Sequence, residues 1–115
     1  MTKEKTALYS ELQGTGKDTF LYRLHEEDVW DEQAYKLFEE KCCAFLNCIS
    51  GPDKKEDNSD IFRLLADRLA YISHSVFCHY SGSDLFVIKN WSERTEKKLI
   101  PDFFDSCRFI FSKMF

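Results

Sequence analysis

Two clusters in the chain contain residue types that could support metal binding or catalysis, and the first pairs His74 with Cys78. These residues stand four positions apart, so on a helix both side chains project from the same face. Imidazole and thiolate groups bind Zn²⁺, but a structural zinc site needs four ligands and no second pair with matching spacing follows. A cysteine nucleophile also needs an orienting group and oxyanion donors, which the neighbouring residues do not supply. The sequence therefore predicts packing for this pair, with no metal site and no catalytic residue.

The second cluster is Gly14-Thr15-Gly16-Lys17, which is similar to part of a phosphate-binding loop. A true loop of this type has a glycine five residues before its Gly-Lys pair, where this chain has Glu11. It also has serine or threonine after the lysine for magnesium, where this chain has Asp18. We therefore expect a plain turn, no nucleotide and no other cofactor.

An acidic segment is the strongest candidate for a binding site. Its acids fall within seven positions, with Trp30 among them: Glu26, Glu27, Asp28, Asp31 and Glu32. One interpretation is a solvated helix start with Trp30 packed into the core, because acids favour the positive end of the helix dipole. The other is an acidic rim around an aromatic anchor, which would steer and hold a basic protein. On the second interpretation the predicted partner-binding site also includes Glu39 and Glu40, two helical turns further along.

Composition restricts the classes of function that remain. The net charge of −4 disfavours nucleic-acid binding, which depends on lysine and arginine contacts to phosphate. No apolar run approaches the ~18 residues of a membrane span. The first six residues carry charges of both signs and do not form a secretory signal. Five cysteines without a framework favour reduced thiols and a cytoplasmic location.

The elements that must position these residues are predicted to be mostly helices. Expected helices cover residues 4–13, the stretch from Asp28 or Asp31 to about 50, residues 59 or 60 to about 80, and Pro101 to the end. Residues 51–59 read as a polar surface loop. Residues 19–24 are ambiguous between strand and helix, and residues 84–100 favour a helix capped by Ser83 over a strand at Leu85–Ile88.

The expected fold is a single mainly α domain over residues 1–115. It is a compact bundle of about four to five helices, with or without one short hairpin or strand pair. Apolar residues at helical spacing mark the side of each long helix that we expect to be buried. In the middle helix these are Ala34, Leu37, Phe38, Cys42, Phe45 and Ile49. In the next they are Ile61, Leu64, Leu65, Leu69, Ile72 and Val76. In the last they are Phe103, Phe104, Cys107, Ile110, Phe111 and Met114.

A small, acidic, helical chain without a catalytic constellation resembles the immunity proteins that accompany bacterial polymorphic toxins and contact-dependent growth-inhibition toxins. This resemblance implies a non-catalytic bacterial protein that binds and neutralises a cognate toxin domain, often a nuclease with a basic groove. An alternative is a helical adaptor or regulatory subunit that self-associates through its Phe-rich C-terminal helix. A third possibility is a small metal- or redox-responsive protein that uses His74 and Cys78.

Overall fold

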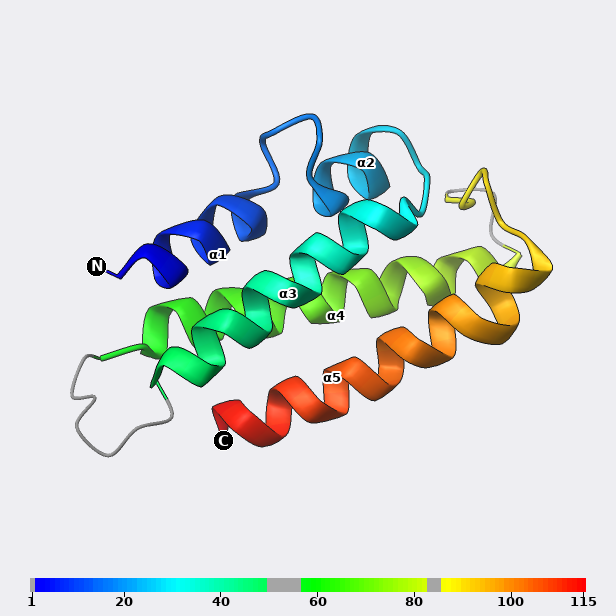
Figure 1. Cartoon of the computed structure of the whole chain (residues 1–115). Coiled ribbons are helices and arrows are strands. Elements are labelled where there is room, and N and C mark those ends of the chain that lie inside the picture. The colour runs from blue at the N-terminus through cyan, green and yellow to red at the C-terminus, as the bar shows by residue number, and fades with distance from the viewer. Residues whose placement is uncertain (1, 50–56, 83–85) are drawn as a thin grey trace.

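Three long helices form the body of the molecule, and two short helices cover one side of it. The computed structural model describes residues 2–49, 57–82 and 86–115. Helix α3 (Glu32–Ile49) crosses α4 (Ser59–Ser81), and α5 (Ile100–Met114) runs beside them (Figure 1). Helices α1 (Lys3–Gln13) and α2 (Phe20–Glu26) pack on the other side of α3. A π-helical turn, η1 (Thr95–Leu99), leads directly into α5.

Short polar side chains and glycines set the ends of these helices. The hydroxyl of Thr2 accepts a hydrogen bond from the N–H of Lys5, and Thr19 accepts one from Tyr22. The carboxylate of Asp31 accepts one from the N–H of Ala34 at 3.0 Å, which begins α3. Gly14 and Gly82 follow α1 and α4 in the left-handed conformation that commonly ends a helix.

An aromatic cluster lies where α2, α3 and α5 meet, and its rings belong to Phe20, Trp30, Tyr35, Phe38 and Phe103. The Trp30 ring lies 4.8 Å from Phe20 and 5.7 Å from Phe103, centroid to centroid, and meets both edge to face. Such pairs stabilise a fold by about 0.5–1.5 kcal/mol beyond the burial of their area. The cluster therefore holds α2 against α3 and α5.

The prediction of a mainly α bundle of about four to five helices is confirmed, and the described residues contain no strand. The ambiguous residues 19–24 are helical. The preference for a helix over 84–100 is wrong for residues 86–92, which are extended or turned. Their backbone bonds to distant groups instead, since the N–H of Lys89 donates to the carbonyl of Asp28 at 2.7 Å. The proposed Ser83 cap and most of the loop at 51–59 lie outside the described residues.

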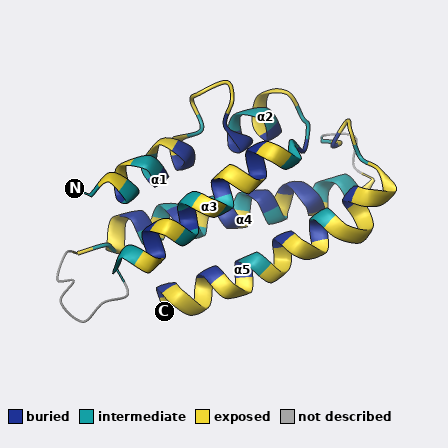
Figure 2. Ribbon diagram, viewed as in Figure 1, coloured by how far each residue is buried: buried dark blue, intermediate teal, exposed yellow. Residues whose placement is uncertain are grey.

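The predicted apolar faces are correct for α4 but only partly correct for α3 and α5. Leu37 is half exposed, whereas Tyr35 and Leu46 are buried in its place. On α5, Phe103 is buried, but Phe104 and Phe111 are not (Figure 2). Successive residues of a helix differ by about 100° in direction, so both are buried only where neighbouring elements cover a wide arc of the helix, as at Ala34 and Tyr35 of α3. The position of α5 at the edge of the bundle leaves two of its six predicted residues, Phe104 and Phe111, uncovered.

The adjacent residues Phe103 and Phe104 give a direct test of which side of α5 faces the bundle. The side chain of Phe103 is fully buried, and that of Phe104 is 43% exposed. We expect Phe103→Ala to lower the free energy of unfolding by about 3–5 kcal/mol, and Phe104→Ala to lower it by at most about 1 kcal/mol. Urea denaturation followed by circular dichroism measures both values. Equal losses in the two variants would show that α5 packs in a different rotation.

Candidate functional site

A row of exposed phenylalanines lies along α5 and at the residue that follows it. Phe104, Phe111 and Phe115 stand at positions i, i+7 and i+11, and are 43%, 36% and 87% exposed. This spacing places them on one side of the helix, about 100° from the buried row. Together with Phe62 of α4 we call these residues the aromatic surface.

Ring contacts join three residues of the aromatic surface, Phe62, Phe111 and Phe115, to one another. The ring of Phe115 lies 6.3 Å from Phe111 and 6.4 Å from Phe62. Phe62 in turn meets the buried ring of Phe45 edge to face at 6.2 Å. Phe111, Phe115 and Phe62 therefore form a series of ring contacts that reaches the core residue Phe45. A rigid aromatic group of this kind loses little conformational entropy on binding, which favours tight contacts.

The acidic segment lies at the corner between α2 and α3, and its residues differ in exposure. Glu26 and Glu27 are exposed at the end of α2, while Asp28, Asp31 and Glu32 are partly buried. Further along α3, Glu40 is exposed, but Glu39 is partly buried and accepts a hydrogen bond from the hydroxyl of Ser106 on α5. The predicted binding residues thus do not form one uniformly exposed surface.

Basic residues neutralise most of this segment. Arg23 reaches Asp31 at 3.2 Å and Glu27 at 3.6 Å, and Lys89 reaches Asp28 at 4.0 Å. Glu32 accepts two hydrogen bonds from the guanidinium of Arg94, which hold the pKa of its carboxyl below the usual range. Paired charges at a surface produce a weaker long-range field than an unpaired cluster does. The structure therefore gives these acids partners within the chain.

Trp30 is a core residue, and the prediction that it anchors a partner is wrong. Its side chain is only 2% exposed and is enclosed by the aromatic cluster. The amide of Asn90 also brackets its backbone, accepting from the N–H and donating to the carbonyl, both at 2.8 Å. The alternative interpretation, a helix start with a tryptophan packed into the core, describes this corner.

Residues 86–94 pack against the same corner and also contact His79 of α4. The ring of His79 stacks on Trp91 with centroids 4.0 Å apart, and its Nδ1 accepts a hydrogen bond from the N–H of Ile88 at 3.0 Å. That bond requires Nδ1 to be unprotonated. Burial lowers the pKa of His79, while the nearby carboxylate of Glu96 acts in the opposite direction. The neutral ring thus fastens this segment to α4.

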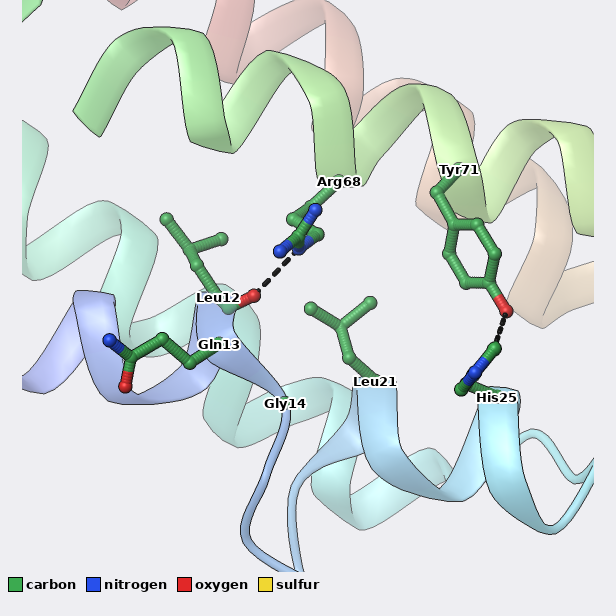
Figure 3. Close-up of a pocket in the computed structure, with 7 residues that line it drawn as sticks. All are labelled: Leu12, Gln13, Gly14, Leu21, His25, Arg68 and Tyr71. Atoms are coloured by element: carbon green, nitrogen blue, oxygen red, sulfur yellow. Dashed lines mark hydrogen bonds between the residues drawn. The ribbon is translucent and has the colours of Figure 1, made fainter. Parts of the chain in front are cut away.

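A cleft of about 250 Å³ lies between α4 and the turn that joins α1 to α2 (Figure 3). Three of its polar side chains, those of His25, Arg68 and Tyr71, form hydrogen bonds within the chain. Arg68 donates from Nε to the carbonyl of Leu12 at 2.7 Å and from Nη1 to Asp67, and Tyr71 bonds to His25 at 2.9 Å. Arg68 satisfies a carbonyl at the end of α1, where helices leave such groups without partners. We therefore assign this cleft a structural role, in which it joins α4 to the end of α1 and to α2.

The two clusters with residue types for chemistry behave differently in the structure. Gly14 ends α1 with φ of 64°, and the N–H of Thr19 donates to the carbonyl of Gly16, so this segment is the expected turn. On α4, Cys78 Sγ lies 3.3 Å from His74 Nε2. Among the described residues no group of three or more histidine, cysteine or acidic side chains is placed to hold a metal ion.

Sequence reasoning missed two residues that matter here. Phe62 was not singled out, although a large aromatic residue beside the apolar row of α4 is a signal of a second contact surface. Asn90 gave no such signal, because its partner Trp30 is sixty positions away.

Comparison of the chain with protein-family models, with curated proteins and with solved structures finds no match in any of the three. In the described parts of the chain, none of the helices has both the length and the apolar character that crossing a membrane requires. A functional proposal therefore has to come from the surfaces described above.

The His79 contact predicts a dependence of stability on pH. The folded state lowers the pKa of His79 from its ordinary value of 6.5, so the unfolded chain binds protons more readily. Its contribution to stability is complete above pH 6.5 and is lost as the pH falls through the folded-state value. We expect His79→Asn, which keeps an acceptor near the Nδ1 position but does not titrate, to reduce this loss. Melting temperatures measured between pH 5 and 8 test it, and identical profiles for the two proteins would contradict it.

Proposed function

We propose that the protein is a non-catalytic protein-binding module that self-associates through its aromatic surface. The observation that carries the proposal is the exposure of Phe104, Phe111 and Phe115 along one side of α5. Apolar residues scattered singly on a surface are normal, whereas apolar residues gathered on one side mark interaction sites. Aromatic residues are also enriched at the centres of interfaces, where they contribute much of the binding energy.

A second copy of the chain is the partner that we propose. A two-fold contact between copies would place each aromatic surface against the other, so that both apolar rows are removed from water in one step. Arg108, exposed on the same side of α5 between Phe104 and Phe111, would lie within that contact. Its guanidinium can stack on aromatic rings, which makes it compatible with such an interface.

A cytoplasmic location is part of this proposal. All five cysteines are free thiols, and Cys42 and Cys107 are buried among core residues. Free thiols persist in reducing compartments, whereas secreted proteins of this size commonly form disulfides.

Phenylalanine substitutions on α5 test self-association with a matched control. We expect Phe111→Ser together with Phe115→Ser to shift the protein to monomer, weakening association by at least about a hundredfold if both rings are central to the contact. Phe109→Ser is the control, because Phe109 is 47% exposed on the same helix but faces a different direction. Sedimentation equilibrium over a range of protein concentrations gives the association constants.

Two outcomes would contradict this proposal, and one control is needed. A wild-type protein that remains monomeric at high concentration would contradict self-association. Equal weakening by Phe109→Ser would show that the aromatic surface is not the specific contact. Circular dichroism must show that each variant keeps its helix content, and Phe111→Ala replaces the double variant if it does not.

An immunity protein that binds a basic toxin domain is our second proposal. It is supported by the exposure of Glu26, Glu27 and Glu40, whose carboxylates lie at the surface of α2 and α3. We rank it below self-association because Asp28, Asp31 and Glu32 are paired with basic residues of the same chain.

Charge reversal at the three exposed glutamates tests the second proposal. We expect Glu26→Lys, Glu27→Lys and Glu40→Lys together to leave the fold intact, since exposed charges stabilise folding by only about 0–1 kcal/mol each. If a basic partner co-purifies with the protein, the variant should bind it more slowly and with less dependence on salt. Association rates at two salt concentrations measure this, and unchanged rates at low salt would exclude the acidic residues from the contact.

A further inference from the structure

Cys78 and His74 of α4 form a pair that the proposed function does not use. Cys78 and His74 are four residues apart, and the helix places the thiol sulfur 3.3 Å from the imidazole Nε2. The ring of His74 also stacks on that of Phe77, with centroids 6.3 Å apart and planes 26° from parallel. The imidazole of His74 thus has two neighbours on its own helix, the ring of Phe77 and the sulfur of Cys78.

An imidazole beside a thiol changes the reactivity of the sulfur. The thiolate is the nucleophile in thiol–disulfide exchange, and a neighbouring histidine accepts the proton and then stabilises the negative sulfur as an imidazolium. His74 is exposed and Cys78 is partly exposed on α4, so a small molecule can reach the pair from solvent.

Three of the other four thiols lie in surroundings that oppose the thiolate, and the fourth has no histidine beside it. Cys42 and Cys107 are buried, and burial raises the pKa of both, that of Cys107 to about 11. Burial and the carboxylate of Glu39 also raise the pKa of Cys43. Cys48 is partly exposed, and the group near its sulfur is a carboxylate oxygen of Glu4, at 3.8 Å, and not an imidazole. One thiol of five thus combines access with an adjacent base.

We propose that Cys78, activated by His74, is a modification site at which small disulfides form a mixed disulfide with the protein. The Cys78 thiol gives its proton to His74, and the thiolate attacks one sulfur of the small disulfide. The new sulfur–sulfur bond forms as the old one breaks, and the departing thiolate takes up the proton from His74. Cys78 and the small disulfide exchange oxidation states, so no further oxidant is needed.

The site of modification can be measured inside one molecule. Fully reduced protein is incubated with oxidised glutathione, and peptide mass spectrometry follows the adduct on each of the five cysteines over time. We expect the first adduct on Cys78, with Cys43 and Cys48 serving as internal controls of comparable access. A first adduct on either control, or equal rates at the three, would overturn the proposal.

Histidine variants separate activation from simple access. We expect His74→Asn and His74→Gln each to slow modification of Cys78 by about fivefold or more, because both lose the base that favours the thiolate. His25→Asn is the matched control, since His25 is also exposed but bonds to Tyr71 instead. Unchanged rates in both His74 variants, with helix content preserved, would show that exposure alone governs Cys78. Cys78→Ser should remove the first adduct and leave the slower ones.

Discussion

The packing of Trp30 is the contact on which the rest of the structure depends. Its ring joins α2 to α5 through Phe20 and Phe103, and its backbone is bracketed by Asn90 from the segment that precedes η1. Three other parts of the chain therefore meet at one residue. Because a buried aromatic group of this size fills a space that no neighbour can fill, its loss would leave a large cavity at the junction. The position of α5, and with it the aromatic surface, follows from this junction.

The acidic residues around Trp30 serve the same junction. Their partners are Arg23 on α2, Lys36 on α3, and Lys89 and Arg94 in residues 86–94. These pairs connect three separate stretches of chain around the buried ring. Each exposed pair is individually weak, but a ring of pairs disfavours other arrangements of the same segments. A row of acids that suggests a binding surface in the sequence is thus engaged largely within the fold.

Local signals in the sequence were sufficient for the helices but not for their surroundings. Asp31 acts within a few residues of itself, so its effect on the start of α3 could be predicted, whereas the expected start at Pro101 is wrong because η1 precedes it without a break. The shape of residues 86–92 could not, because its hydrogen-bond partners Asp28, Trp30 and His79 are distant or act through tertiary packing. The same reason explains the site. The neutralisation of Glu32 comes from Arg94, sixty-two positions away, and the exposure of Phe104 and Phe111 depends on where α5 settles.

The π-helical turn before α5 has a consequence for how this protein can change over evolutionary time. Within it the N–H of Ile100 bonds to the carbonyl of Thr95, five residues back rather than four. One extra residue in a turn rotates everything that follows by about 100°. That is also about the angle between the buried row of α5 and its aromatic surface. A single-residue insertion or deletion at Thr95–Leu99 would therefore turn a different side of α5 toward the bundle, so that the exposure of this surface could change without one substitution in α5 itself.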